Sequence, residues 1–132
     1  MTSSKSVLII DDEPDIREIA KLSLTLTKQW NVFTAASGIE GVTIAADQHP
    51  DAILLDVMMP EVDGLTTLKN LKTHPETQNI PVILLTATTK LAMQSEYFQW
   101  GAQGVLIKPF DPGILGGQIE TALGWQSLES AQ

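Results

Sequence analysis

Polar or charged side chains follow four short apolar runs in this sequence, each at the point where its run ends. They are Asp11 and Asp12, Asp56, Thr86, and Lys108. A run of about four apolar residues is typical of a strand buried on both faces of a parallel sheet. Because the carboxyl ends of parallel strands share one edge, we expect these side chains to converge on one crevice there.

Three carboxylates held close together repel one another and raise one another's pKa unless cations lie among them. Lys108 supplies one positive charge, and a hard divalent cation is the natural second. The chain has no cysteine, and no histidine lies near these acids in sequence. Oxygen ligands alone suit Mg²⁺, with Mn²⁺ as an alternative, better than Zn²⁺. We therefore expect a divalent cation among Asp11, Asp12 and Asp56.

Asp56 is suited to accept a phosphoryl group once such a cation is bound, since carboxylates form aspartyl phosphates. The cation and Lys108 would neutralise the phosphoryl oxygens, and the Thr86 hydroxyl would donate a hydrogen bond to one of them. A threonine that gains this partner only after phosphorylation would be drawn inward with its loop, as a switch. Taken singly, these residues have plainer roles as helix caps, turn formers or solvated ends, but their joint placement favours the functional interpretation.

Alternating strands and helices are needed to position these groups. The apolar runs predict strands over 7–10, 30–35, 52–55, 82–85 and 105–107. Helical periodicity and caps predict helices over 14–28, 38–48, 65–72, 90–99 and 112–123. Five strands alternating with five helices predict an α/β domain, a doubly wound parallel sheet with right-handed crossovers.

The helix ends and faces can be predicted in more detail. Ser37 is the expected N-cap of the second helix, and Asp111 that of the last, with Pro112 at its first position. The first helix should bury a stripe drawn from Ile16, Ile19, Ala20, Leu22, Leu24 and Leu26. The fourth should pack through Leu91, Met93 and Phe98, and the last through Ile114, Leu115, Ile119, Ala122 and Leu123. Gly113, Gly116 and Gly117 should each weaken the last helix by up to about 1 kcal/mol relative to alanine.

Composition narrows the classes of function. A chain of 132 residues forms one domain of ordinary size. A net charge of −8 and a pI near 4.5, without a lysine and arginine stripe, argue against direct nucleic-acid binding. No apolar run reaches the roughly 20 residues of a membrane span, and the first residues lack the apolar stretch of a signal peptide. We therefore expect a cytoplasmic protein without membrane insertion.

Four ordered motifs resemble one known family. IIDDEPD, LLDVMMPEVDG, ILLTA and IKPF are similar to the corresponding segments of the receiver domain of bacterial two-component response regulators. The likeness spans about residues 5–123, nearly the whole chain. The resemblance implies a CheY-like, flavodoxin-like (βα)5 fold with strand order 2-1-3-4-5.

The resemblance also implies roles for individual residues. Asp56 would take a phosphoryl group from the phosphohistidine of a histidine kinase or phosphotransfer protein. Asp12 and Asp56 would bind Mg²⁺ together with the backbone carbonyl of Met58, and Asp11 would assist largely through water. Lys108 would pair with the phosphoryl group, and Thr86 would be the switch hydroxyl.

One position departs from the family pattern. Receiver domains commonly carry tyrosine or phenylalanine three residues before the lysine, where this chain has Val105. Signal transmission through rotation of an aromatic ring is therefore not expected in the usual form. Three other bulky side chains, Tyr97, Phe98 and Trp100, either pack in the core or form a contact with a partner.

The leading expectation is a phosphorylated receiver domain over residues 1–125 with a tail over 126–132, either a single-domain protein or part of a longer one. It would not be an enzyme beyond assisting its own phosphorylation and dephosphorylation. It would signal to a downstream protein, and a phosphorylation-dependent dimer is left open. The alternatives are a Mg²⁺-dependent phosphatase or phosphotransferase with an aspartate nucleophile, and a scaffold that is not phosphorylated. The absence of a D-x-D arrangement after the first strand disfavours the former, and three mutually repelling acids disfavour the latter.

Overall fold

The computed structural model describes residues 5–57, 64–87 and 95–125. Within these ranges one sheet contains five parallel strands in the order β2-β1-β3-β4-β5. The strands are β1 (Ser6–Ile10), β2 (Asn31–Ala35), β3 (Ala52–Asp56), β4 (Val82–Thr86) and β5 (Ala102–Ile107). The predicted flavodoxin-like order is confirmed, although β5 begins at Ala102 rather than at Val105.

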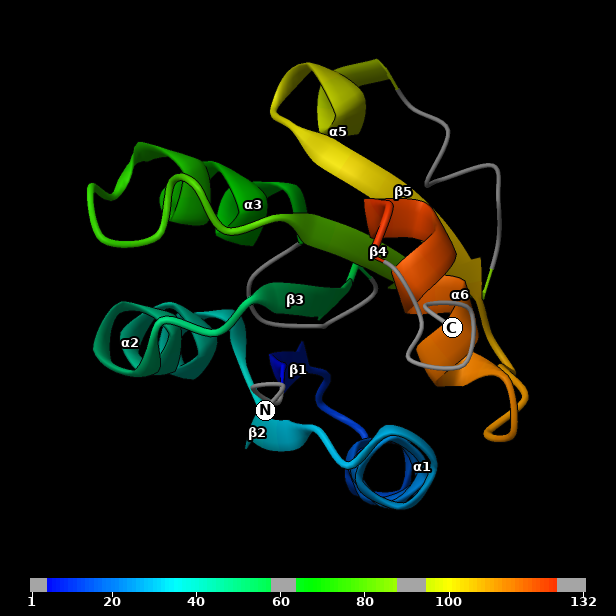
Figure 1. The fold of residues 1–132 in the computed structure, drawn as a ribbon. Coiled ribbons are helices and arrows are strands. Elements are labelled where there is room, and N and C mark those ends of the chain that lie inside the picture. The colour runs from blue at the N-terminus through cyan, green and yellow to red at the C-terminus, as the bar shows by residue number, and fades with distance from the viewer. Residues whose placement is uncertain (1–4, 58–63, 88–94, 126–132) are drawn as a thin grey trace.

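Helices cover both faces of this sheet (Figure 1). They are α1 (Pro14–Lys28), α2 (Gly38–Gln48), α3 (Gly64–Thr73), α5 (Ser95–Gln99) and α6 (Leu115–Leu123). In Figure 1, α1 and α6 lie on one side of the sheet, and α2, α3 and α5 lie on the other. The described part of the fourth expected helix is α5, so Leu91 and Met93 lie outside the described residues.

The sheet separates two apolar clusters, because side chains alternate between its faces. One cluster, under α2, α3 and α5, includes Leu8, Ile53, Leu68 and Leu84. The other, under α1 and α6, includes Ile9, Leu54, Leu24 and Ile119. β3 and β4 are buried along their whole length, as expected of strands covered by helices on both faces.

The ends of α1 and α2 are set by individual residues. The Ser37 hydroxyl accepts a hydrogen bond from the Glu40 amide, which confirms the predicted N-cap of α2. Pro14 occupies the first turn of α1, where its missing N–H costs no hydrogen bond. Both helices end at residues in the left-handed conformation, Gln29 and His49.

The predicted start of the last helix is wrong. α6 begins at Leu115, and residues 112–114 form a turn. The Asp111 carboxylate accepts a hydrogen bond from the Gly113 amide, so it closes this turn instead of capping the helix. The turn leaves Ile114 53% exposed, which also contradicts its predicted place on the inner face.

The predicted inner faces of two other helices are too wide. On α1, Ala20 and Leu24 are buried, but the apolar side chains of Ile19, Leu22 and Leu26 are exposed. On α5, Phe98 is exposed, which contradicts its predicted role in the core, whereas the neighbouring Tyr97 is buried. Trp100 packs partly buried against the cluster under α2, α3 and α5.

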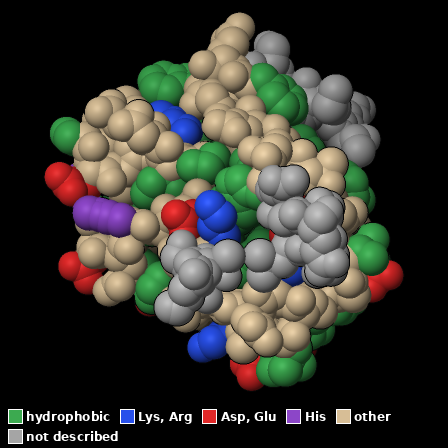
Figure 2. Space-filling view, in the orientation of Figure 1, with side chains coloured by type: hydrophobic (Ala, Val, Ile, Leu, Met, Phe, Trp, Pro, Cys, Tyr) green, Lys and Arg blue, Asp and Glu red, His purple; other side chains and the backbone are tan. Residues whose placement is uncertain are grey.

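Within the described ranges, no helix combines the length and apolar character that crossing a membrane requires. On the face drawn in Figure 2, lysine and arginine side chains are scattered and form no continuous stripe.

Candidate functional site

The register of the sheet brings the predicted site residues to one edge. Ile10 lies beside Leu55, and Asp56 lies beside Leu85, so Asp11 and Asp56 leave neighbouring strands at the same level. Thr86 lies beside Ile107, and the Lys108 amide donates a hydrogen bond to the Thr86 carbonyl at 2.8 Å. The predicted convergence of four segments at the carboxyl edge is therefore observed.

The turn after β1 is held by its own polar groups. Asp11 Oδ1 accepts a hydrogen bond from the Glu13 amide at 2.9 Å, and Arg17 Nη1 donates to the Asp11 carbonyl at 2.8 Å. The Asp11 amide donates to the Ala35 carbonyl on β2. These bonds fix the backbone of residues 11–13, and with it the direction of three successive acids.

Lys108 provides the cation that was predicted among the carboxylates. Its Nζ lies 2.9 Å from Asp11 Oδ2, 2.9 Å from Glu13 Oε1 and 3.4 Å from Asp56 Oδ2. The lysine side chain is only 12% exposed, and the side chains of Asp11 and Asp56 are almost fully buried. The Lys108–Pro109 peptide bond is cis. The contacts of Nζ with Asp11 and Asp56 show that the ammonium is directed inward over the end of β3.

The electrostatics of this ammonium follow from its surroundings. Burial works to lower the pKa of Lys108, because it disfavours the charged form. Close contacts with Asp11 and Glu13, and the charges of Asp11 and Asp56, outweigh burial and raise that pKa above its ordinary value. Lys108 is therefore a permanent positive charge at neutral pH.

One lysine does not balance the acids around it. Carboxylate oxygens of Asp11, Asp12, Glu13 and Asp56 all lie within 4.8 Å of one another. Asp11 Oδ2 is buried and accepts no well-directed hydrogen bond from the described residues, so the ion pair with Lys108 is its compensation. A dense set of oxygen donors with excess negative charge fits a hard divalent cation such as Mg²⁺. The donor set is therefore compatible with the predicted metal, whereas Met58 lies outside the described residues.

Thr86 ends β4 and is fully buried at the same edge. The Thr86 carbonyl accepts a hydrogen bond from the Lys108 amide. Because the Lys108 side chain reaches the acidic cluster, Thr86 lies at the same part of the edge as that cluster. Val105, three residues before the lysine, is partly buried against the cluster under α2, α3 and α5.

Two contributors were not singled out from the sequence. Glu13 pairs with Lys108, and Arg17 supports the Asp11 carbonyl. The sequence does indicate Glu13 as a candidate, because it is the third of three consecutive acids after β1 and directly precedes α1. No spacing rule indicates that Arg17 reaches back to Asp11 across the first turn of α1.

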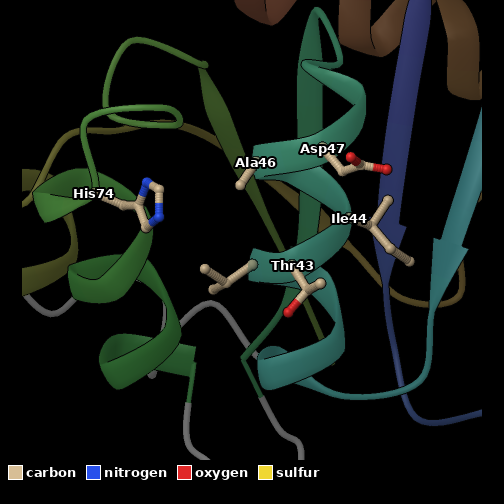
Figure 3. A pocket seen from close by; sticks show the side chains of 6 residues that line it. Thr43, Ile44, Ala46, Asp47 and His74 are labelled. Carbon is tan, nitrogen blue, oxygen red and sulfur yellow. The ribbon is translucent and has the colours of Figure 1, made fainter.

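A separate surface hollow lies between α2 and the turn after α3, and Figure 3 shows it closely. The His74 ring faces Ala46 across it, whereas Asp47 points away from His74 (Figure 3). His74 Nδ1 accepts a hydrogen bond from the Glu76 amide at 3.1 Å, so this nitrogen is already engaged. The hollow contains none of the residues of the acidic cluster.

The fold and the edge site together define a class: a flavodoxin-like domain with an acid-rich crevice and an inward lysine at the carboxyl ends of its strands. The family model of the response regulator receiver domain matches residues 7–120. The chain belongs to this family of two-component response regulator receiver domains.

Curated relatives agree with this assignment. The chain is 36% identical over 129 residues to the regulatory protein AtoC of Escherichia coli, covering 98% of this chain and 27% of that protein. It is 39% identical over 105 residues to the DNA-binding dual master transcriptional regulator RpaA of Synechocystis, covering 80% of this chain and 43% of that protein. The chain therefore spans less than half the length of these two relatives.

Solved structures agree as well. The chemotaxis protein CheY4 of Vibrio cholerae superposes with a TM-score of 0.84 at 30% identity, covering 91% of this chain and 99% of that one. The receiver domain of the sensor histidine kinase PA1611 from Pseudomonas aeruginosa, described with a magnesium ion coordinated in its active site cleft, has a TM-score of 0.80 at 26% identity. It covers 92% of this chain and 99% of that one.

Proposed function

We propose that this chain receives a phosphoryl group on the Asp56 carboxylate and relays the event to another protein. The observation that carries the proposal is the placement of Asp56, almost fully buried at the end of β3, 3.4 Å from Lys108 and within a dense acidic cluster. A structural aspartate has no need of such surroundings, whereas a phosphoacceptor needs cations that neutralise the incoming oxygens.

The phosphoryl donor is the phosphohistidine of a histidine kinase or phosphotransfer protein. An Asp56 oxygen forms a bond to phosphorus, the phosphorus–nitrogen bond of the donor breaks, and the leaving imidazole takes the electron pair and a proton. Asp11, Asp12 and Asp56 would hold Mg²⁺, or Mn²⁺ in its place. When bound, the cation supplies positive charge that stabilises the phosphoryl oxygens.

Lys108 and Thr86 register the arrival of the phosphoryl group. The lysine ammonium is within reach of the end of β3 and pairs with a phosphoryl oxygen. The Thr86 hydroxyl donates to another oxygen, and this new hydrogen bond draws Thr86 inward. Since Val105 stands at the usual aromatic position, the change is transmitted without rotation of a ring at that residue.

The output is binding to a downstream protein rather than catalysis on an external substrate. The chain is not an enzyme beyond assisting its own phosphorylation and dephosphorylation, and it acts in the cytoplasm, where its donor presents phosphohistidine. The relative RpaA is named as DNA-binding, but here the acidic charge of −8 makes a protein the better direct partner.

Labelling of an Asp56→Asn variant tests the proposal. Radiolabelled acetyl phosphate or a phosphorylated kinase domain should label the wild type in Mg²⁺, and the variant should incorporate no label, because an amide cannot form the acyl phosphate. Asp47→Asn, which neutralises an exposed acid on α2, is the matched control and should label normally. Label that persists in Asp56→Asn, or that is undiminished after chelation of Mg²⁺, would contradict the proposal.

A further inference from the structure

Lys108 shares its ammonium among three carboxylates that differ sharply in exposure. Asp11 and Asp56 are almost fully buried, whereas the Glu13 side chain is 58% exposed. The two short contacts, at 2.9 Å, are those with Asp11 and Glu13, and the contact with Asp56 is longer at 3.4 Å. The ammonium is therefore held more closely by the acids after β1 than by the acid that would carry phosphorus.

The contact with Glu13 does not follow from the local needs of the helix. Glu13 is the N-cap residue of α1, but its side chain makes no capping hydrogen bond. Its backbone is set by the Asp11 carboxylate, which accepts from the Glu13 amide, and by the Arg17 amide, which donates to the Glu13 carbonyl. This leaves the carboxylate extended toward Lys108, a residue 95 positions away in the chain.

A phosphoryl group on Asp56 would require Lys108 to direct one of its N–H donors to a new oxygen. Releasing Asp11 would strand a buried charge, which is costly. Releasing Glu13 costs much less, because water can solvate its exposed carboxylate. The difference in exposure thus determines which of the two short contacts is exchanged.

We propose that Glu13 is a positioning residue, an exchangeable carboxylate that holds the Lys108 ammonium in the unphosphorylated protein and releases it to a phosphoryl oxygen. The inference rests on the proposed function and adds a regulatory element to that site. Glu13 stabilises the resting arrangement of Lys108, so it sets how strongly the phosphorylated arrangement is favoured. Removing its charge should therefore favour the phosphorylated arrangement.

A phosphoryl analogue measures this equilibrium without a kinase. Beryllium fluoride with saturating Mg²⁺ is titrated into the full chain, and binding is followed by fluorine NMR. Glu13→Gln should bind the analogue about threefold more tightly than the wild type, the size expected from a partly exposed ion pair. Damage to the fold would weaken binding, so the direction of the change separates positioning from a structural role. Equal or weaker binding by Glu13→Gln would overturn the inference.

Two further variants separate contact from overall charge. Glu18→Gln makes the same chemical change at an exposed position on α1 and should bind as the wild type does. Glu13→Asp keeps the charge but shortens the side chain by one methylene, so it should resemble Glu13→Gln if contact with Lys108 matters. Wild-type affinity in Glu13→Asp would overturn the inference. Absence of analogue binding by the wild type would instead reject the proposed function of Asp56, which distinguishes the two failures.

Discussion

Two mostly buried lysines occupy opposite situations in this molecule. Lys28 on α1 pairs with Glu120 on α6 at 2.9 Å, and their side chains are 16% and 11% exposed. Lys108 is 12% exposed, but three carboxylates surround its ammonium. Lys28 and Glu120 form an ion pair between two helices, which we call the balanced pair, whereas described carboxylates outnumber Lys108 at the edge of the sheet.

The different surroundings of Lys28 and Lys108 indicate a structural role for the first lysine and a functional role for the second. A buried pair of opposite charges satisfies itself, and losing one partner leaves a charge that the interior cannot solvate. In a cluster with excess negative charge the carboxylates repel one another and destabilise the folded protein. An added cation or the loss of one acid relieves this repulsion. The balanced pair should therefore be sensitive to mutation and indifferent to Mg²⁺, and the cluster should behave in the opposite way.

Breaking the balanced pair should give the largest loss of stability. Glu120→Gln removes the carboxylate from Lys28 in a place with little water, so we expect the free energy of unfolding to fall by about 2 to 3 kcal/mol. Urea denaturation followed by circular dichroism measures the change. Glu18→Gln, an exposed acid on α1, is the control and should lie within about 0.5 kcal/mol of the wild type. A loss of that small size in Glu120→Gln would show that the two lysines do not differ as described.

Adding Mg²⁺ should stabilise the folded protein through the acidic cluster and leave the Lys28–Glu120 pair unaffected. A cation that binds only the folded acidic cluster stabilises it by about 1.4 kcal/mol at a concentration about ten times its Kd. Thermal unfolding with Mg²⁺ and with chelator measures this gain in the wild type. Asp56→Asn should lose most of the gain, whereas Glu120→Gln should keep it despite its lower stability. An equal gain in Asp56→Asn would place the bound cation elsewhere.

Most of the site could be predicted because its residues end buried strands. Asp11, Asp56, Thr86 and Lys108 each follow an apolar run, and a parallel sheet carries such ends to one edge without further information. Glu13 was not identified as part of the site, because its role depends on a contact 95 positions away. Pairing over that distance is a property of the fold and has no local pattern.

The errors in the fold have local physical causes. Asp111 followed by Pro112 indicates either a helix start or a turn, and the carboxylate closes the turn instead. On α1, apolar residues exceed what one helix face can bury, so periodicity alone could not decide that Leu22 and Leu26 would be exposed. These cases depend on how neighbouring elements pack, which sequence patterns do not contain.

Two adjacent glycines on α6 give the smallest and most local test of the comparison. Glycine is a poor helix former, so alanine at either position, in the first turn of α6, should add up to about 1 kcal/mol of stability if space allows. At Gly117 an added Cβ meets nothing within 4 Å, and Gly117→Ala should realise this gain. At Gly116 the Cβ would lie 2.6 Å from Lys28 Cγ and 3.0 Å from Lys28 Cε, so the lysine side chain would have to move.

Gly116→Ala should therefore displace the Lys28 side chain from its pair with Glu120 and lower the free energy of unfolding by about 1 kcal/mol, despite the better helix former. The two variants differ only in which face of α6 receives the methyl group, so denaturation of both isolates the contact with Lys28. In the Glu120→Gln background the cost of Gly116→Ala should shrink, because the pair that it disturbs is already broken. Equal stabilisation by both alanines would mean that Lys28 is not held by close approach of α1 and α6, and the balanced pair would lose its structural role.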